Sequence, residues 1–348
     1  MSRPLPSAEL AEAISLAGDW SPLRGARLFI TGGTGFFGKW LLETLGAANQ
    51  ALELGVVATV LSRDPQRFLD AMPHLAQAPW LRLQQGDVLN FTFPTGAFSH
   101  ILHGAASSDA RDYQQEPAAM RRILVDGTQR ALDFTARQPA PRLLLISSGA
   151  VYGPQTPGLT HFPEDYPLPP DTDDPAQAYA QGKREAERLA MAAAATHSFP
   201  CPIARCFAFA GPHLPLDQHF AFGNFIRNAL AGGPIRVAGD GTSRRSYLYA
   251  SEVAAWLWAM MLRGNSGPYH VGSEADVSIR ELAETIAAAV GAAVEIAEAP
   301  QDAAPISRYV PVVRRIPVEL GLSQTVSLRE SIARTLNWNH DHCTPGEA

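Results

Sequence analysis

The segment Thr31-Gly32-Gly33-Thr34-Gly35-Phe36-Phe37-Gly38 decides the fold. A mostly apolar run of strand length, residues 26–30, precedes it, and residues 39–45 follow with three leucines on one helical face. Glycines at this spacing let the backbone approach a pyrophosphate, which the amides and dipole of the following helix attract. A tight turn that binds nothing is the alternative, but the strand-loop-helix context favours a dinucleotide cofactor. The predicted contacts are Gly32, Gly35, Phe36, Phe37 and Gly38.

Composition sets limits on the class of protein. The chain has 348 residues, a hydrophobic fraction of 46% and a net charge of −6. This length suits a large globular domain with a second lobe. The negative net charge does not indicate a basic surface that would bind nucleic acid. We find no signal pattern in residues 1–24 and no run of membrane-spanning length, so a cytoplasmic location is the default expectation. The three cysteines lack metal-ligand spacing, and no metal site is predicted.

The end of the predicted second strand bears on cofactor choice. Residues 56–61 form a buried apolar run, and Ser62-Arg63-Asp64 follows it. A carboxylate at this point usually holds the ribose hydroxyls of NAD, whereas an arginine can pair with the 2′-phosphate of NADP. Arg63 precedes Asp64 here, so the sequence favours NADP, with NAD as the alternative. An ordinary solvated surface charge is the competing interpretation of Arg63.

The third and fourth predicted strands supply further cofactor contacts. Residues 81–88 end in Gly86-Asp87-Val88, where Asp87 is expected to receive the adenine amino group. Residues 100–107 end in small side chains that let a cofactor pass close to the backbone, although tight sheet packing would explain them equally well. His103 is expected to be structural. The predicted contacts in these segments are Asp87, Val88, Ala105 and Ala106 for the cofactor, and Ser107 for the substrate.

The alternation of strands and helices continues beyond the fourth strand. A helix is predicted over residues 118–135, a strand over 142–146 and a second long helix over 176–195, where Asp174 serves as the cap and Pro175 begins the helix. Alternating elements of this kind are typical of a parallel sheet covered on both faces. The sequence therefore predicts a Rossmann-type, doubly wound α/β fold.

Tyr179 and Lys183 lie on the second of these helices. A spacing of four places the phenol and the ammonium group on one helical face. A nearby ammonium is expected to lower the pKa of Tyr179 toward neutrality, which suits a phenol for proton exchange with a carbinol or carbonyl. The same spacing is common on helix surfaces, but a preceding glycine loop and Ser148 at a strand end favour an active site.

These motifs together resemble the extended short-chain dehydrogenase/reductases of the nucleotide-sugar epimerase/dehydratase family. The resemblance covers most of the chain and implies a nucleoside diphosphate sugar as substrate. It also implies that Ser148 hydrogen-bonds the substrate oxygen, Tyr179 transfers the proton, and Lys183 holds the nicotinamide ribose; the cofactor carries the hydride. The motifs are residues 31–38, 86–88, 147–153, 205–212 and 245–249, with Tyr179 and Lys183.

Three departures from the family pattern narrow the expected reaction. In the resembled family, members that eliminate water have Thr-Asp-Glu at the positions of Ser148, Gly149 and Ala150. Decarboxylating members likewise have a glutamate at the last of these positions. Glycine and alanine cannot act as acid or base. Ala208 also replaces the family's usual asparagine in the segment that leads to the substrate lobe. The resemblance thus favours a keto-sugar reductase, with an NAD-dependent epimerase and a non-catalytic dinucleotide sensor as alternatives.

The domain plan and assembly complete the expectations. Residues 1–206, with 244–270 returning, are predicted to form the dinucleotide-binding domain, and residues 207–243 and 271–348 the substrate-binding lobe. Arg227 and Arg245 are expected to grip the diphosphate, because guanidinium forks match phosphate oxygens. Helices 118–135 and 176–195 should each carry an apolar stripe beyond what the sheet covers. Relatives pair these helices, which implies a homodimer.

Overall fold

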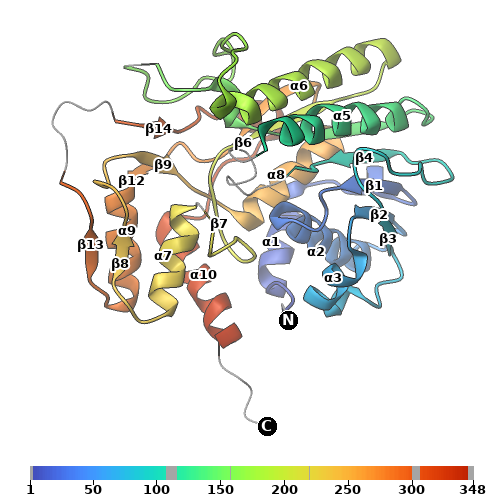
Figure 1. The fold of residues 1–348 in the computed structure, drawn as a ribbon. Helices are drawn as coiled ribbons and strands as arrows, with labels where there is room; N and C mark the ends of the chain where they lie inside the picture. The colour runs from blue at the N-terminus through green and yellow to red at the C-terminus, as the bar shows by residue number, and fades with distance from the viewer. Residues whose placement is uncertain (1–2, 107–115, 157, 219, 300–305, 344–348) are drawn as a thin grey trace.

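The centre of the protein is a seven-stranded parallel sheet in the order β11-β6-β5-β4-β1-β2-β3 (Figure 1). The structure is a computed structural model and describes residues 3–106, 116–156, 158–218, 220–299 and 306–343. The predicted doubly wound parallel sheet is confirmed. The strands are β1 (Arg27–Thr31), β2 (Val57–Ser62), β3 (Leu81–Gln85), β4 (His100–His103), β5 (Arg142–Ser148), β6 (Pro202–Cys206) and β11 (Gly267–Val271).

Helices cover both faces of this sheet. On one side lie α1 (Ser7–Ala17), α2 (Phe36–Ala51) and α8 (Ala250–Arg263), and on the other lie α5 (Pro117–Thr135) and α6 (Ala178–His197) (Figure 1). Alternate residues of β1 serve the two layers: Leu28 and Ile30 join the core under α2 and α8, whereas Phe29 joins the core under α5 and α6. A strand buried on both faces reads as a continuous apolar run, which is why β1 shows no polar alternation.

Predicted and observed element bounds differ in three places. The third and fourth strands end at Gln85 and His103, earlier than predicted. The chain turns after β3, where the amides of Asn90 and Phe91 donate to the carbonyl of Asp87. The helix that carries Tyr179 begins with a single 3-10 turn capped by Asp174, and α6 itself starts only at Ala178. The predicted cap is therefore correct, although it caps a tighter turn.

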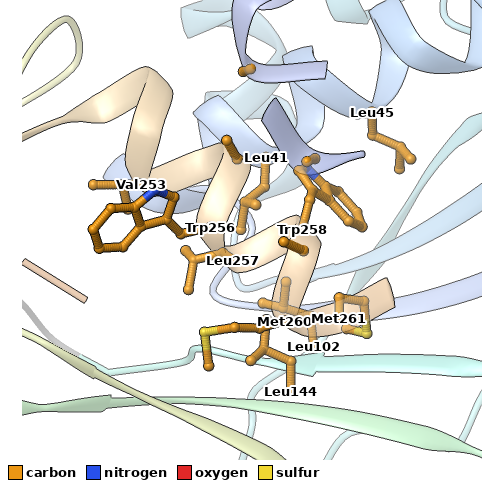
Figure 2. Close-up of a cluster of buried hydrophobic side chains, with 14 of the residues drawn as sticks. Leu41, Leu45, Leu102, Leu144, Val253, Trp256, Leu257, Trp258, Met260 and Met261 are labelled. Carbon is orange, nitrogen blue, oxygen red and sulfur yellow. The ribbon is translucent and has the colours of Figure 1, made fainter. Parts of the chain in front are cut away.

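Helix α8 forms the centre of the larger core (Figure 2). Its tryptophans, leucine and methionines are fully buried between α2 and the sheet. The labelled residues of this cluster are Leu41, Leu45, Leu102, Leu144, Val253, Trp256, Leu257, Trp258, Met260 and Met261. A helix that is apolar on all sides is stable only when it is enclosed on all sides.

The N-terminal helix α1 joins distant parts of the chain. Tyr249 donates its hydroxyl proton to Glu9 at 2.7 Å, and Arg334 donates to Glu12 at 2.8 Å. Just before the helix, the amide of Leu5 donates to the buried carboxylate of Glu43 on α2 at 2.7 Å. Helix α1 therefore links α2 and β10 (Leu248–Tyr249) to α10 (Leu328–Cys343).

A second core lies beyond β6 and is built from small strands and three helices. Helix α9 starts with a full capping box between Ser278 and Glu281. The division near residue 207, with 244–270 returning to the first domain, stays a prediction; β9 pairs with β12 and β14 rather than with the seven-stranded sheet. The elements are β7 (Phe209–Ala210), α7 (Ala221–Leu230), β8 (Ile235–Val237), β9 (Arg244–Ser246), β10 (Leu248–Tyr249), β12 (Asp276–Ser278), α9 (Ile279–Val290), β13 (Val294–Ile296), β14 (Arg308–Tyr309) and α10 (Leu328–Cys343).

Within the described ranges, no helix is both long and apolar enough to cross a membrane.

Truncation of Leu257 tests the central role of α8. Leu257 is 0% exposed, so Leu257→Ala should lower the free energy of unfolding by about 2–5 kcal/mol through lost burial and the cavity left behind. The matched control Leu168→Ala removes the same atoms from a side chain that is 38% exposed and should cost less than about 0.5 kcal/mol. Urea unfolding measures both changes, and equal losses would contradict the assignment of the core.

Candidate active site

The fold itself requires two glycines near the junction of β1 and α2, Gly32 in the loop and Gly38 in the first turn of α2. Gly32 has φ +75°, and a Cβ placed there would lie 2.4 Å from the backbone of Gly104. A Cβ on Gly38 would lie 2.3 Å from the carbonyl of Gly33. These distances are far inside van der Waals contact, so both positions let β1, α2 and the loop after β4 approach one another. Glycine at these two sites is thus explained without a ligand.

Gly35 is different, because packing does not explain it. Its φ of −82° suits any residue, and a Cβ would meet only the carbonyl oxygen of Gly32, at an ordinary 3.5 Å. Gly35 stands at the N-cap of α2, where no side chain of the described residues caps the helix. Gly35 thus leaves the backbone before the α2 amides uncovered, where an anion binds most favourably. The residues present therefore fit a pyrophosphate.

A buried chain of hydrogen bonds fixes the floor of this site. The hydroxyl of Thr31 lies 2.7 Å from Nδ1 of His103, and Nε2 of His103 lies 3.0 Å from the hydroxyl of Thr128. Thr128 donates to the carbonyl of Leu124, so it accepts from Nε2, and Thr31 donates to Nδ1. Burial lowers the pKa of His103 to about 3 and keeps it neutral. His103 thus has the structural role expected from the sequence.

The remaining predicted cofactor contacts lie at the same edge of the sheet. Arg63 is exposed directly after β2, and Asp87 follows β3 with one carboxylate oxygen accepting from the amide of Leu89 at 2.9 Å. The side chain of Val88 is buried in the core beneath α5. Ala105 and Ala106 follow β4. Ser107 lies outside the described residues.

Ser148, Tyr179 and Lys183 meet where β5 ends against α6. Ser148 is the last residue of β5, and its hydroxyl accepts from the amide of Ala150 at 3.1 Å. Lys183 is buried, lies 5.9 Å from the centre of the Tyr179 ring, and donates to the carbonyl of Ile146 at 2.8 Å. The structure therefore brings together the three side chains selected from the sequence.

The pKa of Tyr179 differs from the expectation. Burial raises it to about 12, and a hydrogen bond with Ser148 lowers it only in part. Burial also lowers the pKa of Lys183 to about 8. The prediction that Lys183 lowers the pKa of Tyr179 toward neutrality is wrong for this arrangement, because desolvation of the phenol outweighs the lowering by its hydrogen bond with Ser148. Tyr179 is held as a neutral phenol, ready to donate a proton.

Tyr309 completes the site and was not selected from the sequence. Its hydroxyl lies 3.3 Å from Oγ of Ser148, and its ring centre lies 4.7 Å from that of Phe207. A Cβ on Gly149 would come within 2.7 Å of the Phe207 ring and 2.8 Å of the Tyr309 hydroxyl. The place of a side chain at position 149 is thus taken by two aromatic residues.

The two predicted diphosphate ligands have different surroundings. Arg245 on β9 pairs in register with Tyr309 on β14, and burial lowers the pKa of its guanidinium. Its Nη1 donates to the carbonyl of Arg244 at 2.7 Å. Arg227 projects from the exposed side of α7. The structure therefore connects Arg245 to the Ser148 and Tyr179 site through Tyr309, but provides no such connection for Arg227 among the described side chains.

A buried ion pair fixes α6 against the sheet. Glu187, one turn after Lys183, accepts from Nη2 of Arg205 at 2.7 Å and from the hydroxyl of Ser147 at 2.5 Å. Arg205 on β6 also donates to the hydroxyl of Tyr152 at 2.7 Å. Both charged side chains are 7% exposed. The strands that end in the active site and the helix that carries Tyr179 thus share one polar network.

The sequence matches the model of the NAD dependent epimerase/dehydratase family over residues 28–272. The chain belongs to this family. The resemblance to extended short-chain dehydrogenase/reductases is thereby confirmed, and the protein is an enzyme of the epimerase/dehydratase family.

Three relatives illustrate the similarity. The chain is 28% identical to UDP-glucuronic acid decarboxylase 3 of Arabidopsis thaliana over 319 residues. This alignment covers 90% of each chain. The structure of DesIV, a dTDP-glucose 4,6-dehydratase of Streptomyces venezuelae with NAD bound, is 26% identical with a TM-score of 0.74, over 90% of this chain and 97% of that one. MoeE5, solved with UDP-glucuronic acid and NAD, is 25% identical with a TM-score of 0.74, over 91% and 100%.

Two glycine substitutions separate cofactor binding from folding in this family member. Gly35→Ala meets no clash, so we expect a protein of near-normal stability that binds NAD(P)H at least about tenfold more weakly, the scale of one lost charge-assisted contact. Gly38→Ala should destabilise the fold itself, because its Cβ overlaps the Gly33 backbone. Thermal unfolding and nucleotide titration of both variants provide the measurement. Normal cofactor affinity in Gly35→Ala would contradict the assigned phosphate position.

Proposed function

We propose that the protein reduces a keto group of a nucleoside diphosphate sugar with NADPH. The observation that carries this proposal is a complete Ser148, Tyr179 and Lys183 centre without a carboxyl group at positions 149 and 150. Elimination of water needs both an acid and a base beside the sugar. Gly149 and Ala150 can be neither, whereas hydride and proton transfer need only the residues present. The residues present therefore support reduction over dehydration and decarboxylation.

The protonation state of Tyr179 favours the reductive direction. Reduction of a ketone requires a proton donor at the developing alkoxide, and a neutral phenol with a pKa of about 12 supplies that proton throughout the neutral range. The Ser148 hydroxyl donates a hydrogen bond to the same oxygen, and Lys183 holds the ribose of the nicotinamide. A bound nicotinamide would supply the hydride. The protein residues therefore position the substrate and deliver the proton.

The substrate class rests on Arg245 and on the family. A partly buried guanidinium beside the active site suits a diphosphate, because it offers paired donors and a charge of the right sign. Arg227 is a weaker candidate, since its side chain is exposed on α7. MoeE5, named above, was solved with UDP-glucuronic acid. A nucleoside diphosphate sugar is therefore the substrate that we infer.

The end of β2 supports NADP over NAD. Asp64 is the nearest carboxylate, but its Oδ1 accepts from the amide of Arg67 at 3.0 Å and caps helix α3 (Pro65–Ala71). This hydrogen bond ties one carboxylate oxygen to the start of α3, while the exposed Arg63 can meet a 2′-phosphate. NAD in the DesIV and MoeE5 structures favours the second candidate, an epimerase that oxidises its substrate and returns the hydride to the opposite face.

Homodimer formation and a cytoplasmic location stay predictions. The stripe expected on the predicted interface helices is mixed in character. Exposed positions of α5 include an Arg122–Asp126 ion pair and a Gln129–Asp133 hydrogen bond, whereas α6 exposes Met191. A homodimer interface formed by these helices would therefore bury the polar pairs of α5 against the second subunit.

Substitution of Arg63 tests the choice of cofactor. Arg63→Ala should weaken NADPH binding by about tenfold or more through the loss of charge-assisted hydrogen bonds, and leave NADH binding within about twofold. Arg24→Ala, at the opposite end of the sheet, is the matched control and should change neither affinity. Fluorescence titration of the wild type and both variants with each cofactor measures all six constants. Tighter binding of NAD(H) than of NADP(H) by the wild-type protein would move the epimerase to first place.

Tyr179→Phe tests the chemistry because it removes only the hydroxyl. Turnover of a keto sugar nucleotide with NADPH should fall by about 10²-fold or more, while cofactor affinity is retained. The wild-type enzyme should form no 4-keto-6-deoxy product from a nucleotide hexose that carries its 6-hydroxyl. Mass spectrometry of products and the absorbance of NADPH report both results. Robust dehydration would overturn the reductase, and interconversion of two sugar epimers without net NADPH consumption would establish the epimerase.

A further inference from the structure

Tyr309 reaches the active site from a distant part of the chain. It ends β14, a two-residue strand that pairs with β9, and its hydroxyl lies 3.3 Å from Oγ of Ser148. The same hydroxyl donates to the carbonyl of Cys206, also at 3.3 Å. Burial raises the pKa of Tyr309, so its hydroxyl carries a proton at neutral pH. Tyr309 thus links the end of β6 to the serine at the end of β5.

The hydrogen bonds around Ser148 follow from the protons available. A serine hydroxyl has one proton and two lone pairs. When Tyr309 donates to the Cys206 carbonyl, which can only accept, Ser148 is the donor to Tyr309. Ser148 accepts from the amide of Ala150 at 3.1 Å, and its second lone pair is available to the hydroxyl of Tyr179, with which it also hydrogen-bonds. Two phenols therefore flank one serine hydroxyl.

We propose that Tyr309 is a positioning residue that orients the Ser148 hydroxyl and, through it, the proton donor Tyr179. This role rests on the proposed function, in which Tyr179 protonates the substrate oxygen. When substrate binds, the Tyr309 hydroxyl turns from the Cys206 carbonyl to Ser148, which frees the Ser148 hydroxyl to donate to the substrate oxygen. After the Tyr179 O–H bond breaks and the substrate O–H bond forms, the Ser148 hydroxyl donates to the phenolate. Neither Ser148 nor Tyr309 gains or loses a proton, and only the acceptors of their hydroxyls change.

The surroundings of Gly149 explain why this tyrosine and an acid at position 149 exclude one another. The rings of Phe207 and Tyr309 pack together with their centres 4.7 Å apart. A Cβ at position 149 would lie 2.8 Å from the Tyr309 hydroxyl, and a carboxyl group would extend further into the same space. A neutral phenol thus occupies the place where a carboxylate would stand. Such a phenol supports a proton donor but offers no base for elimination.

A double-mutant cycle tests the proposal in the full-length enzyme. Tyr309→Phe keeps the ring against Phe207 and removes only the hydroxyl, so the fold should be retained. We expect kcat for keto-sugar reduction to fall by about five- to tenfold, the scale of one hydrogen bond, with KM for both substrates within about twofold of wild type. In the Ser148→Ala background the same change should have no further effect. An equal loss in both backgrounds, or no loss in either, would overturn the role.

A second measurement needs no substrate. Tyrosine is replaced throughout by 3,5-difluorotyrosine, whose phenol ionises at lower pH, and the titration of residue 179 is followed by ¹⁹F NMR, with Tyr179→Phe identifying its signal. Tyr309→Phe should raise the pKa of Tyr179, because the phenolate loses a cooperative hydrogen-bond chain, and Ser148→Ala should abolish this difference. An unchanged pKa would overturn the proposal even if the protein proves not to be a reductase.

Tyr166→Phe is the matched control for both measurements. Its hydroxyl hydrogen-bonds Thr156, and its ring packs on Phe162 and Tyr152 outside the Ser148 centre. It should leave kcat and the Tyr179 titration as in wild type. If reductase turnover is undetectable while the ¹⁹F cycle behaves as expected, the proposed function fails and the positioning role of Tyr309 stands.

Discussion

The buried ion pair between Arg205 and Glu187 is the interaction on which the active site depends. Taking two charges out of water is costly unless each finds partners, and here the pair is completed by the hydroxyls of Ser147 and Tyr152. Glu187 lies one helical turn from Lys183, and Ser147 directly precedes Ser148. The cost of burying the pair is thus offset by a fixed relation between α6 and the ends of β5 and β6. Removal of one partner would leave the other charged and unpaired beside the catalytic centre.

Much of the fold could be predicted because its signals are local. The run 26–30, the glycine loop and the leucines of α2 lie together in the sequence, and their pattern alone indicates a strand, a turn and a helix. Residues 56–61 and 142–146 add strands that are apolar throughout, as burial on both faces of a parallel sheet requires. Strand ends were less predictable, because turns such as that after β3 depend on single backbone hydrogen bonds.

The active site was predictable to the same degree. Ser148, Tyr179 and Lys183 follow recognisable spacings, and the structure brings them together. Tyr309 has no such signal: β14 has two residues and no periodicity, and only its pairing with β9 places the phenol beside Ser148. The pKa of Tyr179 could not be derived from its spacing to Lys183 either, because burial of both groups depends on tertiary packing. Contacts between distant segments, rather than residue types, account for what the sequence did not reveal.

Helix α1 has a consequence for the order in which the chain is assembled. Its polar partners Tyr249 and Arg334 lie 240 and 322 residues further along the chain than Glu9 and Glu12. During synthesis α1 leaves the ribosome before α10, so it must wait for that helix before both contacts can form. The strands of the Rossmann sheet that follow α1 are therefore made while α1 is still without these partners.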